Sequence, residues 1–137
     1  MEITWPETGS ELLDLSLLCR KADRLVAEGS GLSVDEVHCL TLVSTKDLLS
    51  VKKLREYLGL SPTRISKILR SLEENGFIHR ELSTNDRRVE HVLLTQKGKE
   101  MVDELLVLSG TVGPQILRDF RSLRASAQKP IYVDASD

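Results

Sequence analysis

The clearest structural signal in the chain is a helix whose two ends are both marked, in SPTRISKILRSLEENGF, residues 61–77. Ser61 is a good N-cap, and Pro62 suits the first helical position because its missing N–H has no partner to lose there. Gly76 stands where a helix commonly ends in the left-handed conformation. The sequence therefore predicts a helix from Pro62 to Asn75.

This helix has one apolar stripe and one polar face. The stripe consists of Ile65, Ile68, Leu69 and Leu72. The side chains left facing outward on the first two turns are Thr63, Arg64, Ser66, Lys67 and Arg70. Cations near the start of a helix and the acids Glu73 and Glu74 near its end oppose the helix dipole. The pattern therefore does not serve helix stability, and a partner outside the helix would account for it.

Three further helices are predicted from periodicity and caps. Residues 10–28 form the first, with Ser10 as its N-cap and Gly29 as its stop. Its apolar stripe comprises Leu12, Leu15, Leu18, Cys19, Ala22, Leu25 and Val26. Ser33 and Glu36 form a capping box, which predicts a second helix from Val34 to Ser44. A third, short helix covers residues 51–58 and ends at Gly59.

The remainder of the chain predicts a hairpin followed by an interrupted helix. The apolar runs FIHREL and VEHVLL flank the polar turn STNDRR, residues 83–88. Thr95 caps a further helix, which Gly110, Gly113 and Pro114 are expected to interrupt. We therefore divide the single domain 1–137 into a first helix (10–28), a central core (34–94), a C-terminal helical segment (95–124) and a tail (125–137) without clear periodicity.

Charge is distributed unevenly along the chain. The formal net charge is -2, but residues 46–99 hold 12 Lys/Arg against 7 Asp/Glu, and the remainder holds 7 against 14. A basic centre with acidic ends suits a module whose middle approaches a polyanion while its ends pair with another chain. The alternative is an ordinary solvated surface.

Several classes of protein are disfavoured. No apolar run reaches membrane-spanning length and the N-terminus is acidic, so no membrane contact and a cytoplasmic location are expected. Two cysteines and three dispersed histidines lack the spacing of a metal site, and no cofactor is expected. Nucleophile–base, P-loop and glycine-rich dinucleotide motifs are missing, which argues against an enzyme.

A short helix, a tight turn, a second helix and a hairpin make a winged helix-turn-helix, so the fold class is mainly α with a small β-hairpin wing. The second helix fits a major groove, where Arg64 can bind guanine and where Ser61 and the helix start can bind phosphate. Arg88 at the hairpin tip suits a narrow minor groove, with Asp86 holding its guanidinium outward. Arg87 is better assigned to a phosphate.

Residues 51–98 resemble the DNA-binding core of the MarR family of bacterial transcriptional regulators. The family pattern is a helix-turn-helix, then LEEKGL.ER, an Asp-x-Arg wing and a strand ending in LT..G. The matching positions occur in the same order: Leu72–Glu74, Gly76, Asp86, Arg88, Leu94, Thr95 and Gly98. By this resemblance Arg88 is the wing arginine, Asp86 is its partner, and the helix from Pro62 is the recognition helix.

The resemblance implies a sequence-specific regulator, acting as a repressor, that binds pseudo-palindromic double-stranded DNA operators as a homodimer. The dimer contacts would come from the first helix and from the helix after Thr95. A winged-helix module that binds another protein, without direct DNA contact, is the alternative. Some family members bind a small-molecule effector in an aromatic-lined pocket. This chain has only five aromatic residues, which argues against such a pocket, so a small-molecule effector stays an open alternative.

Two readings of the cysteines also stay open. One branch of the family senses peroxide through a cysteine in the first helix, which makes Cys19 a candidate redox sensor. Its place on the apolar stripe favours instead a small buried hydrophobic residue. Cys39 is expected in the core.

Overall fold

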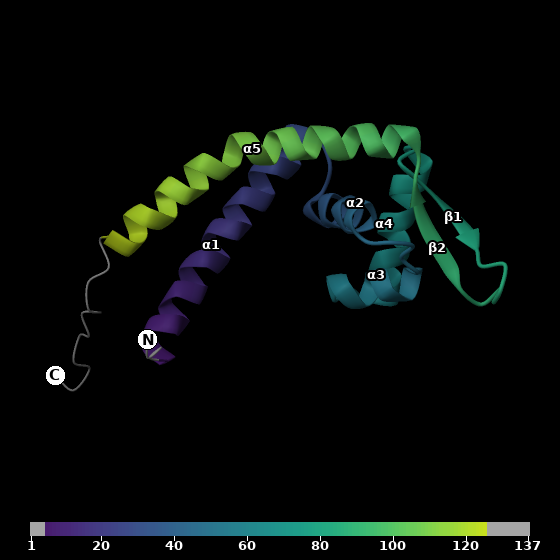
Figure 1. Ribbon diagram of the computed structural model, residues 1–137, viewed down its shortest axis with the longest axis horizontal. Coiled ribbons are helices and arrows are strands. Elements are labelled where there is room, and N and C mark those ends of the chain that lie inside the picture. The colour runs from purple at the N-terminus through teal and green to yellow at the C-terminus, as the bar shows by residue number, and fades with distance from the viewer. Residues whose placement is uncertain (1–4, 126–137) are drawn as a thin grey trace.

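The computed structural model describes residues 5–125, with side chains from residue 9 onward. Figure 1 shows a head, which contains α2, α3, α4 and the hairpin, and an arm in which α1 and α5 run away from it. The predicted mainly helical class with a hairpin wing is confirmed. The elements of the described range are α1 (Trp5–Ser30), α2 (Val34–Thr45), α3 (Val51–Leu58), α4 (Pro62–Glu74), β1 (Ile78–Leu82), β2 (Glu90–Leu94) and α5 (Gln96–Ala125).

Local hydrogen bonds set the ends of α2 and α3, and the sequence predicts the capping box of α2 and the stop of α3 at Gly59. Both bonds of the capping box are present: Glu36 N donates to Ser33 Oγ over 3.2 Å, and Ser33 N donates to Glu36 Oε1 over 3.1 Å. Ser50 caps α3 by accepting from Lys53 N. Gly59 ends α3 with a φ of 65°, a conformation that glycine adopts without steric cost.

The helix α4 also begins and ends as predicted. Ser61 Oγ accepts from Arg64 N over 3.2 Å, and Pro62 occupies the first turn. Asn75 is the C-cap, and Gly76 follows it with a φ of 78°. The four residues of the predicted apolar stripe are all buried, which anchors α4 in the head by one face and leaves the opposite face in solvent.

The hairpin pairs β1 and β2 in antiparallel register, from Ile78 opposite Leu94 to Leu82 opposite Glu90. Ser50 forms an isolated bridge with His91 on the other side of β2. The hairpin is therefore tied on one side to the residue that caps α3. Thr95 caps α5 by accepting from Gly98 N over 3.0 Å, as predicted.

One core holds the head together. The largest fully buried side chains come from α2, α3, α4 and both strands: Cys39, Leu40, Leu54, Leu69, Leu72, Ile78 and Val92. Burying a leucine, isoleucine or valine side chain contributes roughly 1.5–3 kcal/mol each. The hairpin and the helix-turn-helix are thus parts of the same packed unit.

The predicted bounds of the first helix are wrong. α1 begins at Trp5, so Ser10 lies inside the helix rather than capping it. It ends at Ser30, and the left-handed residue is Gly31, with a φ of 76°. Gly29 has another role: a Cβ added there would lie 2.9 Å from Leu108 Cδ2. The missing side chain lets α1 approach α5 closely.

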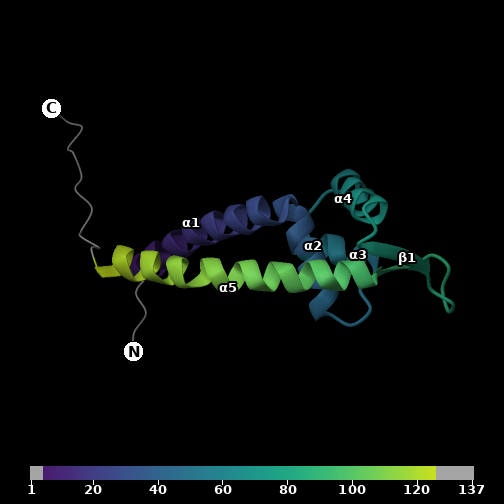
Figure 2. The same cartoon turned by 90° about the horizontal axis from the view of Figure 1, so that it is seen from above.

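The predicted interruption of the last helix is also wrong, because α5 continues through Pro114 to Ala125. Proline removes one helical hydrogen bond and strains the preceding turn, but tertiary packing can outweigh that cost. In this chain α5 packs along α1 on both sides of Pro114, and Lys21 Nζ lies 2.9 Å from Asp119 Oδ2. Figures 1 and 2 show α5 running beside α1, with a bend toward its C-terminal end.

The arm carries a second group of ion pairs near its tip, where Arg124 contacts Glu11 at 3.2 Å and Asp14 at 3.6 Å. Beyond Ala125, the predicted tail lies outside the described residues. The assignment of α1 and α5 to dimerisation stays a prediction.

Candidate nucleic-acid interface

The outward face of α4 consists of polar side chains that are available to a partner. Thr63, Ser66, Lys67 and Arg70 are all exposed. Within the described part of the chain, none of these four side chains has a hydrogen-bond or ion-pair partner. A helix advances by about 100° per residue, so positions 63, 66, 67 and 70 cover one continuous side. The predicted face of the recognition helix is therefore present.

Arg64 differs from these four residues. Its Nη2 lies 2.5 Å from Asp35 Oδ2, in the first turn of α2. The Arg64 side chain is nevertheless 64% exposed, whereas that of Asp35 is 23% exposed. The residue predicted to bind a base is therefore held at the edge of the outward face by a carboxylate of a different helix.

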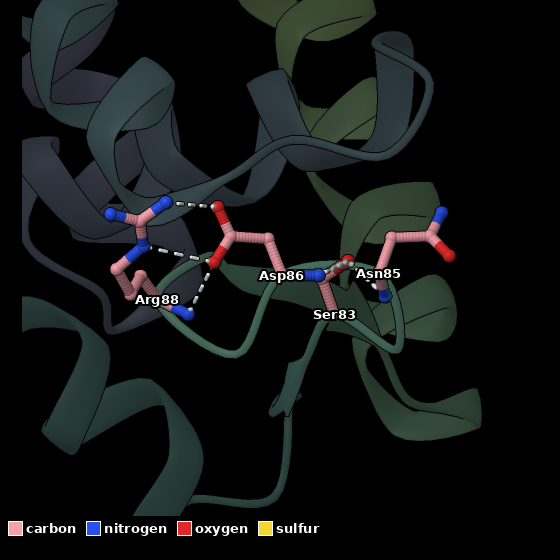
Figure 3. A network of polar contacts seen from close by, with 4 residues as sticks. All are labelled: Ser83, Asn85, Asp86 and Arg88. Carbon is pink, nitrogen blue, oxygen red and sulfur yellow. Dashed lines mark hydrogen bonds and ion pairs between the residues drawn. The ribbon is translucent and has the colours of Figure 1, made fainter.

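The tip of the wing is a small hydrogen-bonded loop (Figure 3). Ser83 Oγ accepts from the backbone N–H groups of Asn85 and Asp86. The Asp86 carboxylate accepts three hydrogen bonds from Arg88: from its backbone N over 3.0 Å, from Nε over 3.1 Å and from Nη2 over 3.3 Å. The predicted contact between Asp86 and Arg88 is confirmed.

Asp86 thus accepts hydrogen bonds from two nitrogens of the guanidinium, while the Arg88 side chain stays 90% exposed. The hydrogen bonds from the Arg88 side chain, followed by the one from its backbone, hold the pKa of the Asp86 carboxyl below its ordinary value. Asp86 is therefore ionised throughout the neutral range, and Arg88 is presented in a fixed direction.

Two cations of this surface were missed by the sequence reasoning. Lys52 and Arg55 of α3 line a groove of about 400 Å³, together with Ser66 of α4 and Arg88 of the wing. Lys52 and Arg55 have no side-chain ion pair within residues 9–125. Lys53, which lies between them in the sequence, pairs with Glu56. Only the folded arrangement reveals that α3 adds positive charge between the recognition helix and the wing.

Arg80 connects the end of α4 to both strands of the wing. Its Nε and Nη2 donate to the Glu73 carboxylate over 3.3 and 3.2 Å, and its Nε lies 3.3 Å from Glu90 Oε1. The hydrogen bond from Arg80 lowers the pKa of Glu73, and that same bond raises the pKa of Arg80. Glu73 and Glu90 therefore act as anchors for Arg80.

The two cysteines lie in opposite environments. Cys39 is fully buried as predicted, and burial, followed by the nearby charge of Glu36, raises its pKa to about 12. Its thiol therefore stays neutral. Cys19 is exposed, so its predicted burial is wrong for the single chain. Within the predicted stripe, Leu18 and Val26 are buried, whereas Leu12 and Leu15 are exposed as Cys19 is.

Neither a metal centre nor a membrane span is found in the described range. No group of three His, Cys, Asp or Glu side chains there is arranged to hold a metal ion. None of its helices combines the length and the apolar character needed to cross a bilayer.

Comparison with known proteins identifies the helix-turn-helix and wing. Residues 32–89, which carry α2 to the tip of the wing, match the model of the MarR family. Residues 32–89 are thus similar to a MarR-family domain. A crystal structure of MarR superimposes with a TM-score of 0.68 at 25% identity, over 81% of this chain and 86% of that one.

Named regulators resemble shorter or longer parts of the chain. The transcriptional repressor MprA of Escherichia coli K12 is 47% identical over 49 residues, which are 36% of this chain and 28% of that protein. Sco3205 of Streptomyces coelicolor, a MarR-family regulator solved in complex with DNA, has a TM-score of 0.68 at 23% identity, over 86% of this chain and 80% of that one. The chain spans about a third or less of the length of the first curated relatives it matches. The relatives are named as transcriptional regulators rather than enzymes.

Proposed function

We propose that the chain is a sequence-specific regulator of transcription that binds double-stranded DNA as a homodimer, represses its target and catalyses no reaction. The recognition helix α4 would enter the major groove, with Ser61, Thr63, Arg64, Ser66, Lys67 and Arg70 as contacts. The wing would approach the adjacent minor groove through Arg88. Arg87, Lys52 and Arg55 would bind phosphates.

The observation that carries this proposal is the side-by-side placement of the wing arginine and the start of α4. Arg88 and Ser66 line the same groove, with Lys52 and Arg55 from α3. A helix that fits a major groove, a positively charged channel and an outward-pointing arginine suit a duplex better than they suit a flat protein surface. Sco3205, which shares the fold, was solved in complex with DNA, and this supports DNA as the partner.

The homodimer is supported by the apolar surface of the arm. Four leucines of α1 are exposed in the single chain: Leu12, Leu13, Leu15 and Leu17. Leu106, Val107, Leu117 and Leu123 of α5 are exposed as well. Exposed apolar side chains concentrated on one part of a molecule mark an interaction surface. A second copy would cover them and present two recognition helices to the two halves of a palindrome.

Salt dependence of DNA binding tests the proposal. A duplex is first selected by the full chain from a random pool, and its Kd is then measured by fluorescence anisotropy between 50 and 200 mM salt. If each dimer neutralises about six to ten phosphates, affinity falls roughly 10³- to 10⁵-fold over this range. A flat response, or failure to select any sequence, contradicts the proposal and favours the protein-binding alternative.

A further inference from the structure

The N-terminal turn of α2 lies against one flank of α4 and holds it at two points. Asp35 contacts Arg64 at the start of α4, and the adjacent Glu36 accepts a hydrogen bond from Ser71 Oγ over 3.1 Å. Positions 64 and 71 are seven residues apart, so their side chains leave the same side of the helix. The two acids of α2 therefore face one flank of α4, next to its outward side.

The two contacts differ in what they hold. Ser71 is half-buried and lies far from the exposed start of α4, and Glu36 also completes the capping box of its own helix. Arg64 lies at the edge of the outward face, and its guanidinium remains mostly in solvent. The contact of Glu36 therefore fixes the packing of two helices, whereas that of Asp35 fixes the direction of one exposed side chain.

The contact with Asp35 leaves most of the N–H donors of the Arg64 guanidinium available to a partner. Arginine carries five N–H donors, and the pair with Asp35 is made through Nη2. Arg88, by comparison, gives both Nε and Nη2 to Asp86. A guanidinium held at one nitrogen still offers two neighbouring donors to the two acceptors of a guanine edge.

We propose that Asp35, a residue outside the helix-turn-helix, is a positioning residue that sets the base specificity of Arg64. The inference rests on the proposed function, since it assumes that α4 meets DNA. Asp35 holds Arg64 in one direction before binding, so that less side-chain entropy is lost when the arginine meets the correct base. The contact also keeps Arg64 from binding nearby phosphates, which an unrestrained arginine can do on any sequence.

This role predicts opposite effects on two kinds of DNA. Without Asp35, Arg64 becomes a mobile cation that finds phosphates on any sequence, so binding to unrelated DNA strengthens. Binding to the selected sequence loses the benefit of the oriented guanidinium. The quantity that reports the role of Asp35 is therefore the ratio of the two affinities rather than either affinity alone.

The test measures Kd for the duplex that the wild-type chain selects and for a scrambled duplex of the same composition. Asp35→Asn is expected to lower the ratio of affinities about 3- to 10-fold and to relax preference at one base position in each half-site. Glu36→Gln is the matched control, because it removes the same charge one residue away while leaving the Arg64 contact. Its ratio is expected to stay within about twofold of wild type. Asp35→Glu keeps a carboxylate and is expected to retain most of the discrimination.

Arg64→Gln supplies the second arm of the test. In that background, Asp35→Asn is expected to change the ratio no further, because the side chain that it positions is gone. The inference is overturned if wild type discriminates between the duplexes and Asp35→Asn discriminates equally well. It is also overturned if Glu36→Gln loses as much, or if Asp35→Asn has its full effect without Arg64. A wild-type chain that does not discriminate at all overturns the proposed function itself, which separates the two failures.

Discussion

At the scale of single residues, two exposed arginines of the interface, Arg64 and Arg88, are each paired with a carboxylate that directs the side chain. Asp86 holds Arg88 within one loop, and Asp35 holds Arg64 across two helices. Exposed ion pairs of this kind stabilise a fold little, because solvent screens them and ordering two side chains costs entropy. Their value lies in orientation, since a fixed arginine loses less freedom on binding.

Substitutions in the wing test this view. Arg88→Ala is expected to weaken DNA binding roughly tenfold on all sequences and to reduce the salt slope by about 2, because each of the two subunits loses one cation from the interface. Asp86→Asn keeps the cation but frees it, so a smaller loss of about threefold is expected, with no loss of salt slope. Anisotropy titrations at several salt concentrations measure both quantities. Glu81→Gln, with the same change of charge on β1, is the control for Asp86→Asn; equal losses from the two would remove the orienting role.

Contacts between residues close together in the sequence could be predicted, whereas contacts between residues far apart in the sequence could not. Asp86 and Arg88 are two residues apart, so their contact could be predicted from the loop itself. Asp35 and Arg64 belong to different helices and meet only because α2 packs on α4. The same holds for Lys52 and Arg55, whose closeness to Arg88 depends on the bridge between Ser50 and β2.

At the scale of elements, the bounds of α2, α3 and α4 were predicted to within one residue, whereas the bounds of α1 and the continuity of α5 were not. α4 has Ser61, Pro62 and Gly76 to define it, and its bounds agree with the sequence within one residue. α5 carries residues that interrupt isolated helices, yet it continues because α1 packs along it. Local propensity is a weak prior where a long amphipathic face is buried.

The contact of Arg80 with Glu73 and Glu90 predicts a pH-dependent link between α4 and the wing. The folded-state pKa of Glu73 is lowered, so its contribution to stability is present above the pKa of about 4.3 that Glu has when unfolded. That contribution is lost as the pH falls through the lower folded-state value. Arg80→Met is therefore expected to lower the unfolding temperature at pH 7 by a few degrees at most, since the acids are exposed.

The difference in unfolding temperature between wild type and Arg80→Met is expected to shrink as the pH falls from 7 to below 4. Thermal unfolding followed by circular dichroism across this range measures it. Arg87→Met, which removes a wing cation without a carboxylate partner in the described range, is the control. A difference that stays constant with pH would show that Arg80 acts through packing of its apolar stem instead.

The junction between the hairpin and α5 depends on Gly98. A Cβ built on this residue would overlap the carbonyl oxygen of Phe77, which is backbone and cannot turn away. That carbonyl also accepts from Thr95 N, so the close approach is part of the cap of α5. Gly98→Ala is expected to destabilise the fold by about 1–3 kcal/mol, measured by urea unfolding. Gly110→Ala, where a Cβ meets open space within the same helix, is expected to be neutral or slightly stabilising.

At the scale of the whole molecule, α5 joins the arm directly to the wing. It starts at the residue after Thr95, at the foot of β2, and ends beside the far part of α1 (Figure 1). A partner that covers the arm would therefore fix the position of both recognition helices of a dimer. Operator affinity then depends on apolar side chains far from any DNA contact.

This dependence gives a test of the dimer that leaves the head untouched. Leu13 and Leu17 are four residues apart on α1 and are 73% and 61% exposed in the single chain. The double substitution Leu13→Glu with Leu17→Glu places two charges on the apolar surface and is expected to yield a monomer by analytical ultracentrifugation. Because the second half-site then no longer benefits from a high effective concentration, affinity for the full operator is expected to fall about 10²- to 10⁴-fold.

Binding to a duplex that carries a single half-site is expected to stay unchanged in the same variant, because α4 and the wing are intact. Leu48→Glu is the matched control: Leu48 is 61% exposed, like Leu17, but lies between α2 and α3 rather than on the arm. It is expected to sediment as wild type does. A double variant that remains dimeric would show that the subunit contact lies outside this part of α1. A double variant that also loses binding to the half-site would show that the arm supports the fold of the head.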